Sequence, residues 1–195
     1  MTKKPFVSFK EIIDHELPSE TIKLTHEGYK LDCSSGDSLK RYCNLNDLKS
    51  ADYLFPKKGK IFIVEFSDIV AQQTKLLEKV ERVKQSDLDK NDKKDVCRRY
   101  LREVVQEMKE KFKDTHTIYT ALPTYFDDLE EEFKSHYDKC LLIISDKALT
   151  DGKMEESKKV VLARFLSGLG AQITNAIPDH INTRVTVSTI GEFSK

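Results

Sequence analysis

The stretch KSADYLFPKKGKIFIVEFSDIV, residues 49–70, decides the fold of this chain. Its second half, IFIVEF, is an unbroken run of β-branched and aromatic residues, which is typical of a strand buried on both faces. A shorter apolar run that ends near Phe55 precedes it, and PKKGK between the two runs has the composition of a turn. The stretch therefore predicts an antiparallel β-hairpin.

Each strand of this hairpin carries one carboxylate, Asp52 near the start of the first strand and Glu65 near the end of the second. Antiparallel pairing brings the two positions to the same end of the hairpin. A carboxylate in an apolar run needs a metal, a cation or a place at the sheet rim, because its unpaired burial is costly. Two interpretations stay open: a metal site at Asp52 and Glu65, or a strand that ends at the surface with Asp52 capping a turn.

The rest of the chain alternates helical and strand-like patterns. We expect a helix over 6–16, a hairpin of two short strands over 21–32 with its turn at 26–28, amphipathic helices over 69–83 and 92–113, a short strand over 117–122, a helix over 126–139, a buried strand over 140–146, a long helix over 154–177 and a final strand over 183–190. This order predicts an α/β fold with a mixed central sheet flanked by helices. We expect a single domain over 1–195, with a helical hairpin at about 68–113 and a parallel crossover after Cys140.

Composition excludes several classes of protein. The 33 basic and 33 acidic residues cancel, so a nucleic-acid surface requires a local excess of positive charge. No apolar run reaches membrane-spanning length, and we expect a cytoplasmic protein without membrane contact. The four cysteines form no C-x-x-C pair, which disfavours a structural zinc. The glycines of SGLGAQ lie in a helical pattern rather than after a strand, which disfavours a phosphate-binding loop.

The stretch from ADYLF to FIVEFSDIVAQQ resembles the PD-(D/E)xK, or restriction-endonuclease-like, superfamily. The similarity consists of an acidic residue on one strand, a hairpin turn, a hydrophobic strand with a second acidic residue, and a following helix. It implies an α/β/α sandwich that opens with a helix. It also implies a Mg²⁺ or Mn²⁺ site with Asp52 and Glu65 as metal ligands, and Glu11 as a candidate ligand from the opening helix.

The sequence departs from the family at Ser67. The family places a catalytic lysine two residues after the second acid, where this chain has serine. Some members carry the cation on the following helix, and Lys75 is the candidate for that role. Lys75 also has an ordinary explanation, as a solvated residue on an amphipathic helix. A further interpretation of Ser67 is that catalysis has been lost.

Two basic groups can contact phosphates or simply keep the surface soluble. They are Lys57, Lys58 and Lys60 in the hairpin turn, and Arg98 and Arg99 near the start of the helix expected over 92–113. The resemblance implies a magnesium-dependent endonuclease that hydrolyses phosphodiester bonds, with DNA as the expected substrate and restriction or phage defence as the setting. The alternative is a degenerate nuclease fold that acts as a protein-binding or nucleic-acid-binding subunit, docking a partner or a second copy through the helical hairpin.

Overall fold

The computed structural model of the chain describes residues 4–18, 20–33, 36–69, 82–83, 85–147, 156–181 and 183–195. In chain order its elements are η1 (Phe6–Phe9), β1 (Lys10–Ile12), β2 (Glu27–Lys30), α1 (Leu39–Tyr42), β3 (Tyr53–Lys57), β4 (Lys60–Phe66), α3 (Lys90–Tyr125), η2 (Glu131–Lys134), β5 (Lys139–Ile144), α5 (Glu156–Ala176), η3 (Asp179–Ile181), β6 (Val185–Thr189) and α6 (Ile190–Phe193).

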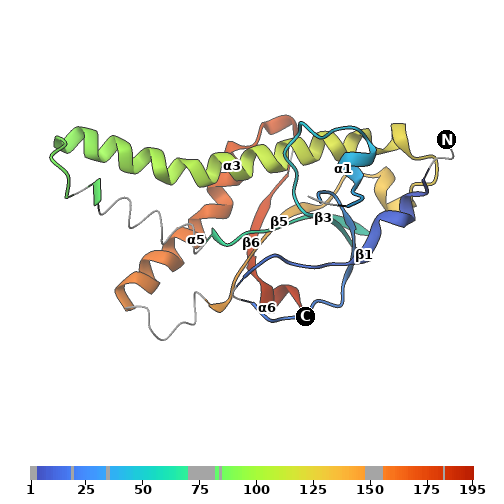
Figure 1. Ribbon diagram of the computed structural model, residues 1–195, viewed down its shortest axis with the longest axis horizontal. Coiled ribbons are helices and arrows are strands. Elements are labelled where there is room, and N and C mark those ends of the chain that lie inside the picture. The colour runs from blue at the N-terminus through green and yellow to red at the C-terminus, as the bar shows by residue number, and fades with distance from the viewer. Residues whose placement is uncertain are drawn as a thin grey trace.

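The six strands form one mixed sheet in the order of the chain, from β1 to β6. Strands β1 to β4 pair antiparallel, whereas β4, β5 and β6 run parallel. Helix α3 connects β4 to β5 and helix α5 connects β5 to β6 (Figure 1). The predicted α/β class, the mixed sheet and the parallel crossover are therefore confirmed.

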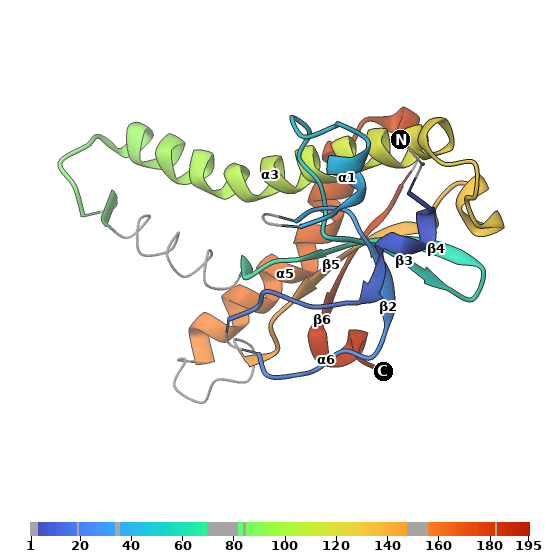
Figure 2. The same cartoon turned by 45° about the vertical axis from the view of Figure 1, so that its right-hand side comes forward.

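The two faces of the sheet are covered differently. Buried residues of α3 and α5, such as Phe112 and Ile173, share one apolar cluster with Leu54 and Ile63 of the central hairpin. The opposite face packs against the segment 13–24 and α6, in a smaller cluster around Val64. Figure 2 shows α6 on the side of the sheet away from α3. Both crossover helices share one face, as expected when parallel strands are added in one direction with the same handedness.

The predicted central hairpin is confirmed, with a tighter turn than the sequence suggested. Pro56 and Lys57 belong to β3 and Lys60 belongs to β4, so only Lys58 and Gly59 form the turn. Both have positive φ angles, 54° and 71°. Two-residue turns of this kind follow the right-handed twist of the strands they join.

The predicted opening helix over 6–16 is wrong. A short 3₁₀ helix, η1, leads directly into β1, which pairs with β2. The apolar residues of this stretch do not share one helical face, because Phe9 packs in the cluster under α3 and Ile13 packs in the cluster on the other side of the sheet. A chain that must reach both faces crosses the sheet edge in an extended conformation.

The predicted hairpin within 21–32 is also wrong in its first strand. The partner of β2 is β1, and residues 21–26 have no regular structure. The sequence pattern suggested a turn at Gly28, but this glycine lies inside β2. A Cβ atom at this position would lie 2.9 Å from the Ile13 side chain, so close packing rather than a turn explains the glycine.

Helix α3 is longer than expected and replaces the strand predicted over 117–122. Ile118, Tyr119 and Leu122 are buried at helical spacing, and the helix ends two residues after Pro123. The helix predicted over 126–139 is only the short η2, in which Phe133 packs against Phe6 and Tyr29.

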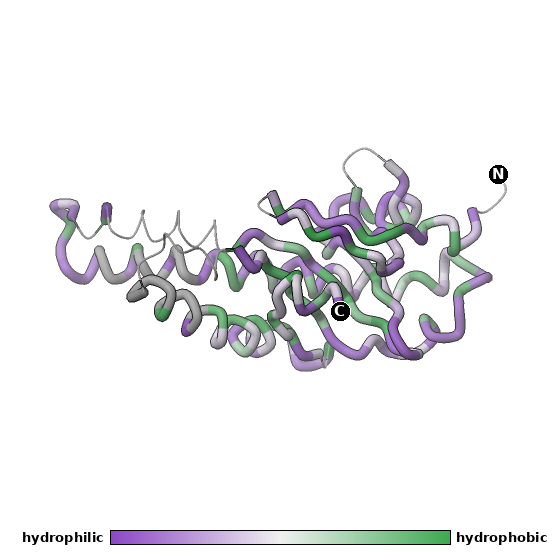
Figure 3. The backbone as a smooth tube through the Cα atoms, turned by 90° about the horizontal axis from the view of Figure 1, so that it is seen from below, coloured by the Kyte–Doolittle hydropathy of each residue, from purple (hydrophilic) through white to green (hydrophobic). Residues whose placement is uncertain are grey.

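The first arm of the expected helical hairpin lies mostly outside the described residues, which omit 70–81. Its second arm is the N-terminal part of α3, which extends beyond the sheet and begins with hydrophilic residues (Figures 1 and 3).

Two glycines of α5 give a direct test of how closely this helix packs. A Cβ atom at Gly170 would lie 2.9 Å from the Val185 carbonyl oxygen of β6, whereas one at Gly168 would lie 3.4 Å from the mobile end of Gln172. We expect Gly170→Ala to lower the free energy of unfolding by about 1 to 3 kcal/mol through overpacking. The matched Gly168→Ala should raise it by about 0.5 to 1 kcal/mol, because alanine favours helices. Urea denaturation of both variants measures this, and equal effects would contradict the close α5–β6 contact.

Candidate functional site

The hairpin holds Asp52 and Glu65 across from each other. Tyr53 pairs with Val64, the backbone amide of Asp52 donates to the Val64 carbonyl at 3.0 Å, and the Phe66 amide donates to the Asp52 carboxylate at 2.7 Å. Asp52 therefore contacts the backbone on both sides of Glu65. Because side chains alternate along a strand, both carboxylates lie on the face that α3 covers.

Lys111 of α3 completes this group. Its ammonium donates to Glu65 Oε1 at 2.5 Å. The side chain of Glu65 is 2% exposed and that of Lys111 is 26% exposed, so the ion pair runs from the interior toward solvent. Oε2 of Glu65 is buried and contacts no hydrogen-bonding group among the residues that the structure describes. One acceptor of the buried carboxylate is thus left without a bond.

Burial and mutual repulsion both act on the two carboxylates. Burial, together with the charge of Asp52, raises the pKa of Glu65 to about 8, although the nearby Lys111 opposes the shift. Burial also raises the pKa of Asp52 to about 6, against the hydrogen bond from the Phe66 amide and the charge of Lys111. Burial alone would lower the pKa of Lys111, but the charges of Glu65 and Asp52 outweigh it and the pKa lies above its usual value.

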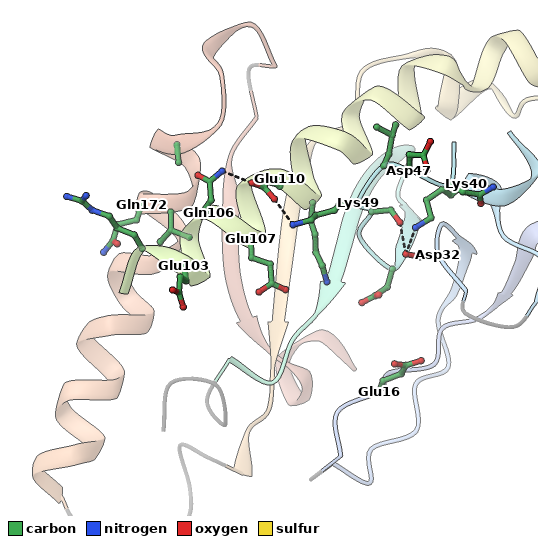
Figure 4. Close-up of a pocket in the computed structure, with 18 of the residues that line it drawn as sticks. Glu16, Asp32, Lys40, Asp47, Lys49, Glu103, Gln106, Glu107, Glu110 and Gln172 are labelled. Atoms are coloured by element: carbon green, nitrogen blue, oxygen red, sulfur yellow. Dashed lines mark hydrogen bonds and ion pairs between the residues drawn. The ribbon is translucent and has the colours of Figure 1, made fainter. Parts of the chain in front are cut away.

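A cleft of about 1420 Å³ opens onto this group. Asp52 and Lys111 line it, together with residues of α3, α5 and the loop before β3. Figure 4 shows Gln106 and Gln172 at one end of this cleft and Asp32 and Lys40 at the other. Asp52 and Lys111 are therefore reached from a long, open groove, whereas Glu65 is buried and does not line it.

Further acidic side chains surround the pair. Glu16 and Asp32 line the cleft and their charges raise the pKa of Asp52, while Glu107, one turn before Lys111, raises the pKa of Glu65. Asp32 accepts hydrogen bonds from Lys40 at 2.6 Å and from Ser50 at 3.0 Å. Within the described parts of the chain, no three His, Cys, Asp or Glu side chains gather closely enough to hold a metal by themselves.

The structure does not bring Glu11 to this site. Glu11 lies on β1 rather than on a helix, and its carboxylate bonds to Lys30 and to the Tyr53 hydroxyl, each at 2.9 Å. The Tyr53 ring belongs to the cluster on the opposite face of the sheet from Asp52. Glu11 therefore forms its ion pair with Lys30 away from Asp52 and Glu65. Lys75 lies outside the described residues.

The predicted phosphate-binding residues divide between two places. Lys57, Lys58 and Lys60 are exposed at the turn of the hairpin, the end away from Asp52. Lys60 pairs with Asp138 at 2.8 Å. Arg99 is exposed on α3 and lines the cleft, whereas the side chain of Arg98 is outside the described part.

Sequence reasoning missed Lys111, although a signal was present. Val104, Met108 and Phe112 form the buried stripe of α3, and Lys111 lies three residues after Met108 and seven after Val104. A lysine on the core-facing side of an amphipathic helix needs a buried anion as partner, because charged groups are rarely buried alone.

Comparisons of the chain with protein-family models, with curated proteins and with solved structures gave no match. No helix among the described residues combines the length and the apolar character needed to cross a membrane.

The raised pKa of Glu65 predicts how stability depends on pH. The folded protein binds this proton more tightly than the unfolded chain, so the free energy of unfolding should fall as pH rises from the ordinary value of 4.5 to about 8. Glu65→Gln removes the titrating group. We expect the stability of the wild-type protein relative to this variant to drop by about 4 kcal/mol across that range.

Urea denaturation at several pH values measures this difference. Glu103→Gln, which changes an exposed carboxylate on α3, is the matched control and should run parallel to the wild-type protein. A stability difference for Glu65→Gln that does not change with pH would show that Glu65 is not held in a desolvated place.

Proposed function

We propose that this protein is a metal-dependent nuclease that hydrolyses phosphodiester bonds in nucleic acid, with Asp52 and Glu65 as metal ligands and Lys111 as the catalytic cation. The observation that carries the proposal is the meeting of the buried Glu65, the half-buried Asp52 and Lys111 beside an open cleft. The charge of Asp52 raises the pKa of Glu65, and a cation that both carboxylates bind would offset this repulsion.

The residues present fit a divalent ion such as Mg²⁺ or Mn²⁺. Magnesium is commonly held by one or two protein carboxylates, with water and substrate phosphate filling the remaining positions. The carboxylates of Asp52 and Glu65 supply hard oxygen donors. Among the described residues, no group donates a hydrogen bond to Oε2 of Glu65. When bound, the ion supplies Lewis-acid stabilisation of negative charge on the phosphate.

The protein's own groups have separate tasks in this proposal. The Phe66 amide fixes the Asp52 carboxylate, and the hairpin fixes the separation of Asp52 from Glu65. Lys111, partly exposed to the cleft, is placed to hold the attacking water and to offset charge that develops at the phosphate. Apolar neighbours keep water away from the inner side of Glu65, which strengthens electrostatic interactions there.

The arrangement also supports a restriction-endonuclease-like fold. The acidic hairpin, the mixed sheet and a helix behind the second acidic strand agree with the resemblance that the sequence showed. Two features differ from it: β1 replaces the opening helix, and the cation comes from α3 instead of the position of Ser67. In this proposal a cation from α3 takes the role of the lysine that the family places at the position of Ser67.

Cleavage of DNA and RNA with Mg²⁺ or Mn²⁺ tests the proposal. We expect the wild-type protein to cut, Glu65→Gln and Asp52→Asn to lose cutting, and Lys111→Ala to cut roughly 10²- to 10³-fold more slowly, as when one charge-stabilising group is removed. Lys113→Ala, an exposed lysine on the same helix, should keep the full rate.

An inactive wild-type protein in the presence of either metal would overturn the proposal. It would favour the alternative, a degenerate nuclease fold that binds a partner. In that case the Glu65–Lys111 pair serves only to stabilise the fold. Equal loss of rate in Lys111→Ala and Lys113→Ala would remove Lys111 from the catalytic group.

Metal binding can be measured apart from cleavage. A metal present at 100 times its Kd should stabilise the folded protein by about 2.7 kcal/mol, which for a chain of this size raises Tm by roughly 5 to 10 °C. Asp52→Asn should lose this shift. Asp47→Asn, an exposed carboxylate that lines the same cleft, should keep it. A shift that survives in Asp52→Asn would place the metal elsewhere.

A further inference from the structure

We propose that the end of the cleft between α3 and α5 is a binding arm for one strand of nucleic acid, and that Arg99 and Arg102 contact its phosphates on one side of the cleaved bond. The inference rests on the proposed function, since it places the arm relative to Lys111. It goes further because it names the substrate class, which is single-stranded nucleic acid, and the length of strand that the protein binds.

The charges of the cleft single out the two arginines. Acidic residues outnumber basic residues in its lining, seven to five. The three lysines are paired: Lys40 with Asp32, Lys49 with Glu110, and Lys111 with Glu65. Arg99 and Arg102 are exposed and form no ion pair with any residue that the structure describes. They are therefore the cleft's available cations.

The surroundings of the arginines suit a polar strand. Gln106 follows Arg102 by one turn of α3, and Gln172 and Asn175 face the cleft from α5. Figure 4 shows Gln106 and Gln172 near each other at this end of the cleft. Amide side chains offer both hydrogen-bond donors and acceptors, which bases and sugars can use without a charge. The opposite end, with Asp32 and Asp47, has one amide side chain in its described lining, that of Asn46.

The spacing along α3 sets the length of the contact. Arg102 and Arg99 precede Lys111 by nine and twelve residues, which corresponds to about 14 and 18 Å along a helix. A stacked strand advances about 3.4 Å per nucleotide, so the two arginines lie about four and five phosphates from the one at Lys111. A more extended strand would need fewer nucleotides to cover the same distance.

Charge density favours a single strand over a duplex. Over 18 Å a single stacked strand carries about five phosphates and a duplex about ten, because the duplex has one charge per roughly 1.7 Å. The cleft has an excess of acidic residues. Two unpaired arginines can therefore offset part of the charge of a single strand, but little of the charge of a duplex. Repulsion from the acidic lining would be greater for the duplex.

Binding measurements test the arm without requiring cleavage. The probe is a fluorescein-labelled oligothymidylate or oligouridylate of 4 to about 16 nucleotides, and the protein is the full-length Glu65→Gln variant. We expect affinity to rise with length and to level off within about 10 nucleotides. A duplex of equal length should bind more weakly. The same titration of wild-type protein in EDTA serves as a second measurement that does not depend on the folding of the variant.

Removal of both arginines should change affinity and salt dependence together. For single strands the slope of log K against log salt is about −0.7 per phosphate contact, so Arg99→Ala with Arg102→Ala should reduce its magnitude by about 1.4. At 0.1 M salt the same rule gives a loss of affinity on the order of 20-fold. Lys23→Ala with Lys195→Ala removes equal charge from exposed positions that do not line the cleft and is the matched control, with little expected effect.

Three results would overturn the arm. They are tighter binding of the duplex, an unchanged salt slope in the arginine variant, and equal weakening by the lysine control. The experiments can refute the proposed strand binding by Arg99 and Arg102 separately from the proposed nuclease activity. Metal-dependent cutting that survives with unchanged binding in the arginine variant refutes only the arm. Arginine-dependent binding of a single strand without cutting supports the arm and refutes only the catalysis.

Discussion

The ion pair between Glu65 and Lys111 is the constraint on which the site depends. Glu65 lies in a central strand with apolar neighbours on both sides, where an isolated charge would be strongly destabilising. Lys111 supplies the opposite charge at 2.5 Å. Because the loss of one member of a buried pair commonly costs about 3 to 5 kcal/mol, this contact fixes the position of α3 over the hairpin. The cleft then forms where α3 leaves the sheet.

The topology explains why this place is open at one end. Strand β4 is where antiparallel pairing with β3 changes to parallel pairing with β5. In open sheets, ligands commonly bind outside the carboxyl ends of strands at points where the strand order or direction changes. Glu65 lies near the carboxyl end of β4. Two crossover helices on a single face give this end a wall on one side and a groove beside it.

Charge within the cleft is arranged unevenly. Asp32 and Asp52 give the centre and one end a negative potential, which favours a divalent cation. The lysines of the same region are held by carboxylates, so they do not attract a polyanion. Among the described residues that line the cleft, the cations without an ion-pair partner are Arg99 and Arg102. In the function proposed above, a phosphate strand and a metal ion therefore have separate places in one groove.

The sequence by itself determined the hairpin, the positions of Asp52 and Glu65 on it, the strand β5, the helix α5 and the strand β6. These follow from local patterns: unbroken apolar runs, a turn between them, and helical spacing of buried residues. Local patterns failed where residues close in the chain serve different faces of the sheet. Phe9 and Ile13 have helical spacing, yet they pack on opposite sides. Gly28 resembles a turn residue, yet it makes room for Ile13.

Only the tertiary structure decided the identity of the cation and the extent of the cleft. Lys111 follows Glu65 by 46 residues, and no spacing rule connects positions that far apart. Their contact depends on the register of β3 with β4 and on the rotation of α3 about its axis, which packing of the whole core sets. Arg99 is a candidate phosphate contact from the sequence, which leaves a solvated helix face as the alternative, whereas Arg102 is not singled out by any pattern. The fold gives them a shared groove with Asp52, because α3 extends past the sheet from the point where Lys111 anchors it.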